Sequence, residues 1–260
     1  MARILLEIVA STVNDCRAAE SGGADRVELC AAIGTGGLTP SLGTLIETKK
    51  RVRIPLMAML RPRAGGFCYS EEEFVSMRRD AALLVEHGAD GIVFGILHSD
   101  GTVDAARCGK LVEIANGRQT VFHRAFDAVP EPMRSLDEII DLGFTRVLTA
   151  GQTKTAHDGR ARLRELIERA ARRIEILPGG GIRSHNVGQL VAATGCSQVP
   201  PHGVFGALRP VDVELSHQLR QPAGRAIVVV RVRGPRGRAA HARDSGPNWE
   251  RHVIPLPRRR

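Results

Sequence analysis

The sequence predicts an α/β fold, a (β/α)8 TIM-type barrel in which the eighth βα unit is atypical or incomplete. Short apolar runs alternate with segments of helical periodicity through the first 200 residues, an order typical of parallel strands joined by helical crossovers. A glycine, two further residues and a β-rich run recur as a unit that begins at Gly23, Gly88, Gly143 and Gly195, spaced 65, 55 and 52 residues apart. Two strands per repeat give eight strands, which favours a closed barrel over the alternative, a doubly wound open sheet.

Four of the expected strands follow these glycines, because glycine can adopt the left-handed conformation that ends a helix before a strand begins. They are expected within residues 23–29, 88–94, 143–149 and 195–199. The other four are apolar runs before or between the repeats, at residues 4–9, 54–60, 120–126 and 173–179. Helical periodicity is clearest at residues 71–88 and 161–173, each of which precedes an expected strand.

The composition of the chain changes near residue 200. Residues 201–260 hold twelve arginines and four acidic residues, a net charge of +8, whereas the preceding residues carry only +1 of the total of +9. Stretches such as "RVRGPRGRAAHARDSGP" replace the apolar periodicity there. We therefore predict a barrel domain over residues 1–200 and an atypical Arg/Pro/Gly-rich tail over residues 201–260, in which residues 225–260 are largely disordered.

Several classes of protein are disfavoured by the sequence. It contains no run of eighteen apolar residues and no cleavable leader, so we expect a cytoplasmic protein without a membrane partner. The five cysteines are odd in number and widely spaced, without a CxxC pair. This pattern argues against a disulfide framework and a zinc knuckle, and indicates reduced thiols.

Polar residues gather at the ends of the expected strands. The stretch "VFHRAFD" places His123, Arg124 and Asp127 at the end of the fifth strand. Because the carboxyl ends of barrel strands meet at one mouth, we expect a single pocket there lined by Glu7, Arg26, Glu28, Arg61, His123, Arg124 and Asp127. Further candidates at strand ends are Arg63, Thr149 and the three glycines Gly179, Gly180 and Gly181. Each residue alone also has a structural interpretation, such as an ion pair between Glu28 and Arg26 or a histidine buried in the core.

Seven motifs carry a resemblance to a known family. In chain order they are "LEI", "GADRVELCAA", "GGLTPS", "RPRAGGFCYS", "FHRAFD", "RVLTAGQ" and "PGGGI". In order and spacing they resemble the CutC copper-homeostasis family, which forms a (β/α)8 barrel. The resemblance covers about residues 4–199 and stops abruptly there, where Pro200 and Pro201 cannot donate to a strand ladder.

The resemblance implies copper homeostasis and binding of Cu(I), a soft ion that prefers thiolate and thioether ligands. The candidate ligands by position are Cys30, within "ELCAA", and Cys68, within "GFCYS". Met57 and Met59 lie at period two on the third strand and are weaker candidates. Buried cysteines and methionines also commonly serve only as core residues.

An enzyme acting on a small anion is the alternative function. Arg26, Arg61, Arg63 and Arg124 suit a carboxylate or phosphate rather than a cation, with Thr149 and backbone N–H groups of the "PGGGI" turn nearby. Glu7, Glu28, His123 and Asp127 are the candidates for proton transfer. No motif fixes the reaction, and the glycine run is equally consistent with a plain tight turn.

The tail raises two further hypotheses. Its charge favours an acidic partner, but Phe205 and Trp249 are its only aromatic side chains apart from histidine, so we do not expect it to bind nucleic acid by base stacking. An abrupt change to Arg-, Pro- and Gly-rich sequence is also what a shifted reading frame near codon 200 would produce. The expected ligand is therefore a copper ion or a small anion, and homo-oligomer formation is left open.

Overall fold

The computed structural model describes residues 4–196 and 226–231 of the 260-residue chain. Eight strands are present in these residues, all in one sheet. They are β1 (Ile4–Ala10), β2 (Arg26–Leu29), β3 (Leu56–Met59), β4 (Gly91–Phe94), β5 (Gln119–Phe122), β6 (Arg146–Thr149), β7 (Glu175–Pro178) and β8 (Ala226–Arg231).

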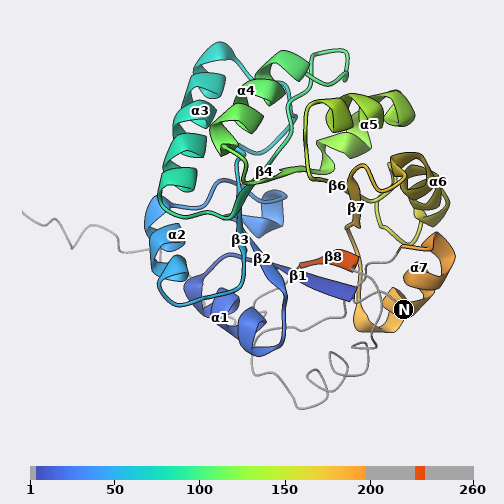
Figure 1. Cartoon of the computed structure of the whole chain (residues 1–260), viewed down its shortest axis with the longest axis horizontal. Coiled ribbons are helices and arrows are strands. Elements are labelled where there is room, and N and C mark those ends of the chain that lie inside the picture. The colour runs from blue at the N-terminus through green and yellow to red at the C-terminus, as the bar shows by residue number, and fades with distance from the viewer. Residues whose placement is uncertain (1–3, 197–225, 232–260) are drawn as a thin grey trace, which may run out of the picture.

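Helices alternate with the first seven strands and lie in an arc around the outside of the sheet (Figure 1). They are α1 (Val13–Ser21), α2 (Leu42–Lys49), α3 (Glu71–Glu86), α4 (Ala105–Ala115), α5 (Pro132–Asp141), α6 (Arg160–Ala170) and α7 (Ser184–Thr194). Two short 3-10 turns, η1 (Ile33–Thr35) and η2 (Arg124–Ala128), follow β2 and β5. Among the described residues, no helix is long and apolar enough to cross a membrane.

The first seven strands pair in parallel with their neighbours in chain order. This pairing confirms the predicted α/β barrel class and excludes the doubly wound alternative, whose strand order reverses at a switch point. Within the described residues no ladder joins β7 to β8, so the sheet is a curled half barrel that is not closed by backbone hydrogen bonds.

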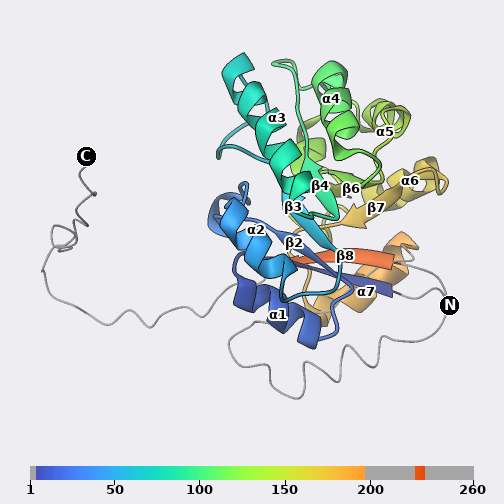
Figure 2. The same cartoon turned by 60° about the vertical axis from the view of Figure 1, so that its left-hand side comes forward.

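The eighth position of the sheet is taken by β8, which pairs in parallel with β1 over six residues (Figure 2). Its sequence, "AIVVVR", is a β-branched run in the segment that we assigned to the tail. The expected strand at residues 195–199 lies outside the described residues from residue 197 onward. Its placement, the boundary at residue 200 and the proposed frameshift therefore stay predictions.

The repeated glycines end helices as predicted. Gly23, Gly88, Gly143 and Gly195 have φ of +86°, +93°, +83° and +64°, the left-handed region that disfavours side chains. The helix starts are also encoded locally. In α3 the Ser70 hydroxyl accepts a hydrogen bond from the Glu73 N–H, and the Glu73 carboxylate accepts one from the Ser70 N–H, a reciprocal cap.

Two apolar layers stabilise the barrel. The larger fills the space between the sheet and the surrounding helices, and includes Phe74, Phe94 and Phe122. The smaller lies among inward-facing strand residues: Val9, Cys30, Met57, Met59, Val93, Val121, Leu148 and Leu177. Alternation along each strand separates the two layers.

A polar layer lies at the amino end of the barrel, and it corrects the expected placement of Glu7 and Arg26. These two side chains are buried and form an ion pair with each other, and they are register neighbours on β1 and β2. Arg26 also contacts Gln119, which accepts a hydrogen bond from Arg146 on β6. Glu7 lies in the middle of β1 because that strand continues to Ala10, so its side chain is not at the carboxyl-end mouth.

Candidate active site at the carboxyl end of the barrel

A cavity of about 580 Å³ opens at the carboxyl ends of the strands. Of the residues predicted for a pocket there, it is lined by Glu28, Arg61, His123, Arg124, Gly179, Gly180 and Gly181. Five further polar or aromatic lining residues were not predicted from the sequence, namely Thr35, Phe67, Lys154, Thr155 and Arg183. Lys154 and Thr155 follow β6, and Arg183 follows the glycine run after β7. The rule that strand ends face one mouth could therefore have found these three.

His123 ends β5 and is 3% exposed. The Ala125 N–H donates to its Nδ1 over 3.3 Å, which places the proton of the neutral ring on Nε2. Nε2 has no hydrogen-bond partner among the described residues, and the side chain lines the cavity. Burial, and secondarily the positive charge of Arg61, lowers the pKa of His123 to about 3. The ring is therefore a neutral imidazole in the cavity wall, with a buried Nε2–H donor.

Arg61 follows β3 and is 6% exposed. Its Nη1 and Nη2 donate to the carbonyl oxygens of Thr35, Gly37 and Gly65. The guanidinium stacks 5.1 Å from the centroid of the Phe67 ring, and its Nε has no partner among the described residues. Several of its donors thus orient the side chain, while its positive charge borders the cavity.

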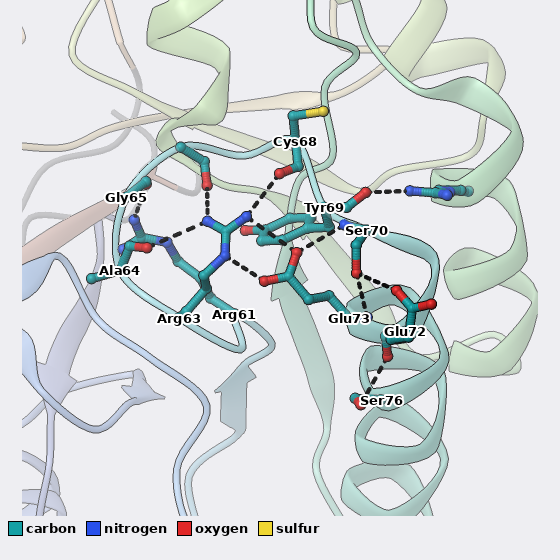
Figure 3. Close-up of polar contacts among 12 residues, drawn as sticks. Arg61, Arg63, Ala64, Gly65, Cys68, Tyr69, Ser70, Glu72, Glu73 and Ser76 are labelled. Carbon is teal, nitrogen blue, oxygen red and sulfur yellow. Dashed lines mark hydrogen bonds and ion pairs between the residues drawn. The ribbon is translucent and has the colours of Figure 1, made fainter.

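Arg63 does not line the cavity but holds the loop that follows β3 (Figure 3). Its guanidinium forms an ion pair with Glu73 and donates to the carbonyl oxygens of Gly66 and Cys68. It also stacks 5.1 Å from the centroid of the Tyr69 ring. These contacts give Arg63 a structural role in the loop that carries Phe67.

Asp127 ties the loop after β5 to the end of β6. Its carboxylate accepts hydrogen bonds from the Thr149 hydroxyl at 2.5 Å, from the Ala150 and Gln152 N–H groups at 3.0 Å each, and from Arg124 Nε at 2.6 Å. So many donors leave little acceptor capacity for a substrate proton. Asp127 and Thr149 are absent from the cavity lining and instead position Arg124, which is part of it.

The "PGGGI" turn brings backbone to the cavity from β7. Gly180 and Gly181 have φ of +101° and +70°. Their carbonyl oxygens accept hydrogen bonds from the Ala156 N–H and the Asn186 side-chain amide. Within the described part of the chain, neither glycine N–H donates to a protein acceptor. A Cβ on Gly180 would lie 3.0 Å from Arg124 Nη1, so a side chain there would crowd the arginine.

The cysteines predicted as copper ligands lie in different surroundings. Cys68 is exposed in the loop after β3. Cys30 is buried at the end of β2, beside Met59, which lines the cavity. A Cβ on Gly37 would lie 3.3 Å from Cys30 Sγ and 3.4 Å from Met59 Cε, so both side chains border one point. In the described ranges no three His, Cys, Asp or Glu side chains are grouped as a metal site.

The family follows from comparison with known proteins. Residues 4–206 match the model of the CutC family. The chain belongs to the CutC family. A CutC family protein of Treponema denticola is 51% identical over 199 residues, covering 76% of this chain and 81% of the relative. The human copper homeostasis protein cutC homolog is 43% identical over 194 residues, covering 75% of this chain and 71% of the relative.

Solved structures agree with this assignment. The crystal structure of CutC from Streptococcus agalactiae superposes with a TM-score of 0.71 at 34% identity, covering 75% of this chain and 96% of that one. An aldolase at 11% identity superposes with a TM-score of 0.53, covering 87% and 89% of the two chains. The likeness to the aldolase concerns the fold alone. The chain is thus a homologue of copper homeostasis proteins, built as a TIM-barrel-like CutC domain.

Proposed function

We propose that this CutC-family protein binds a small anion at the carboxyl-end mouth of its barrel and transfers a proton to or from it. The charge of the cavity lining carries the proposal. Arg61, Arg124, Lys154 and Arg183 face one carboxylate, that of Glu28, while His123 is neutral. Formal charges sum to +3, an excess that favours a carboxylate or phosphate ligand and disfavours a metal cation.

Glu28 and His123 supply the proton-transfer chemistry. Both side chains are buried at the carboxyl ends of their strands and line the same cavity. A carboxylate can accept a proton from a substrate carbon or hydroxyl group. A neutral imidazole with its proton on Nε2 can donate a hydrogen bond to the oxygen on which charge then develops. This division of roles supports proton abstraction beside a carbonyl group.

Calorimetric titration of the full chain with oxalate and with inorganic phosphate tests the binding. Arg183→Gln should weaken both anions about tenfold, because it removes one cavity charge. Glu28→Gln should strengthen them, because it removes the one repelling carboxylate. Arg164→Gln is the matched control, since Arg164 is an exposed residue of α6. The proposal fails if neither anion binds, or if Arg183→Gln behaves like Arg164→Gln.

Cu(I) binding is a second candidate function, supported by the approach of Cys30 and Met59 to the same point beside Gly37. Thiolate and thioether sulfur are ligands that suit Cu(I). We expect Cys30→Ser to lower Cu(I) affinity strongly in an anaerobic competition assay, and Met59→Leu to lower it less. The control is Cys108→Ser, which changes a buried cysteine of α4. Equal affinities in Cys30→Ser and the parent would exclude Cys30 as a ligand.

A further inference from the structure

We infer that the anion bound by this cavity is the phosphoryl group of a small phosphate monoester, seated on the β6–β7 side between Lys154, Arg183 and the Gly180–Gly181 backbone. The inference rests on the proposed function and names its substrate class. It follows from the uneven distribution of charge around the mouth, because the lining residues divide into two groups on different strands.

The β6–β7 side holds two cations that have no carboxylate partner within residues 4–196 and 226–231. Lys154 and Arg183 form no ion pair with any described residue, whereas Arg124 beside them is paired with Asp127. Two uncompensated positive charges match a phosphate monoester, which carries a charge of about −1.5 to −2 at neutral pH. A single carboxylate would neutralise only one of them.

Backbone donors on the same side suit a tetrahedral group. The N–H groups of Gly180 and Gly181 lack acceptors in the described part of the chain, and the turn leads directly into helix α7. Successive N–H groups next to a helix N-terminus form a common phosphate cradle, and in TIM barrels this cradle recurs after the seventh and eighth strands. The absence of a side chain at Gly180 keeps Arg124 close to this backbone, since a Cβ there would lie 3.0 Å from Arg124 Nη1.

The β2–β5 side of the cavity is balanced in charge and polar. Arg61 and Glu28 contribute one positive and one negative charge, and His123 is neutral with Nε2 unpartnered among the described residues. β3 and β7 stand four positions apart in the sheet, so Arg61 and Gly180 lie on different sides of the mouth. This half suits an uncharged carbonyl or hydroxyl group, placed beside the side chains proposed to transfer a proton.

The test compares two probes that differ mainly in the anionic group. Glycerol phosphate and glycerate are each titrated into the full chain in a buffer free of phosphate. We expect glycerol phosphate to bind about tenfold more tightly or better, since it engages one more cation. Lys154→Gln should reduce that affinity about tenfold and change glycerate binding less than about threefold. Lys154 is exposed and forms no ion pair within the described ranges, so the variant should fold normally.

Lys110→Gln is the matched control, an exposed lysine of α4 replaced in the same way. If glycerate and glycerol phosphate bind equally well and Lys154→Gln affects neither selectively, the phosphate assignment is wrong, but the anion site stands. If neither probe binds, and oxalate and inorganic phosphate also fail, both the assignment and the proposed function are wrong. Gly180→Ala is a second test. It should weaken the binding of glycerol phosphate selectively, in a variant whose thermal unfolding shows that it is folded.

Discussion

The imidazole of His123 lies 4.9 Å from the ring of Phe67, measured between ring centroids. The Phe67 ring also stacks against the Arg61 guanidinium, 5.1 Å away. One aromatic side chain thus contacts both a neutral histidine and a permanent positive charge. It also helps to exclude water from the histidine, and this arrangement leads to the first prediction.

Phe67→Ala should raise the pKa of His123 from about 3 toward its ordinary value near 6.5, because removal of the ring admits water that stabilises the charged imidazolium. Phe67→Leu, which keeps apolar cover, should leave the pKa low. Titration of the His123 ring protons by NMR measures both variants. A wild-type His123 that titrates near pH 6 would contradict the burial-based explanation.

The same histidine should make folding sensitive to acid. Its folded pKa of about 3 lies below the unfolded value near 6.5, so the unfolded state binds more protons between these values. The stability that neutral His123 contributes is complete above pH 6.5 and is lost as the pH falls toward 3. Between pH 7 and pH 5, wild type should lose about 2 kcal/mol more unfolding free energy than His123→Gln. Urea denaturation at both pH values measures the difference, and equal losses would refute it.

Asp127→Asn should destabilise the protein by about 2–4 kcal/mol. The amide keeps one acceptor oxygen but loses the charge that pairs with Arg124, and in either orientation its NH2 group would face an N–H donor, that of Gln152 or that of Arg124 Nε. Asp141→Asn, at the exposed end of α5, is the control and should change stability by less than about 0.5 kcal/mol. Comparable midpoints of urea unfolding for the two variants would show that the Asp127 network contributes little.

Arg63→Ala should loosen the loop over residues 64–70 without unfolding the barrel. The substitution removes contacts with Glu73, with two loop carbonyls and with the Tyr69 ring. We expect amide hydrogen exchange in this loop to rise about tenfold, because local opening loses roughly 1.4 kcal/mol of protection. Arg79→Ala, on the exposed face of α3, should leave the exchange unchanged. Unaltered exchange in Arg63→Ala would mean that other contacts hold the loop.

Alanine substitutions at Gly91 and Gly43 should change the unfolding free energy in opposite directions. A Cβ on Gly91 would collide with the Gln119 carbonyl oxygen and with Met57, inside the barrel. Gly91→Ala should therefore cost at least about 1–3 kcal/mol of unfolding free energy. Gly43 lies in α2 with nothing within 4 Å of the added atom, so Gly43→Ala should stabilise by about 0.5–1 kcal/mol. Thermal unfolding of both variants checks the signs.

Much of the architecture was predictable because its signals are local. Glycines at fixed offsets, such as Gly88 and Gly143, end helices through their own backbone freedom. Strand and helix segments can be told apart because each has its own hydrophobic periodicity, and the two kinds of segment alternate along the chain. Parallel crossovers then bring all carboxyl strand ends to one mouth, which is why His123, Arg61 and Glu28 line one cavity.

The tertiary structure decided which polar side chains reach that pocket. The sequence by itself determined the barrel class, the order of the first seven strands and the side of the sheet on which a site forms. Only the tertiary structure placed Glu7 at the amino end beside Arg26, directed Arg63 toward Glu73, and surrounded Asp127 with donors from β6 and the loop after it. The positions of Glu7 and Asp127 depend on the register between strands or on partners in another βα unit, and that of Arg63 depends on a side chain of the helix that follows its loop. A side chain's level in the barrel and its choice of partner are set by such nonlocal contacts, and no local pattern in the sequence encodes them.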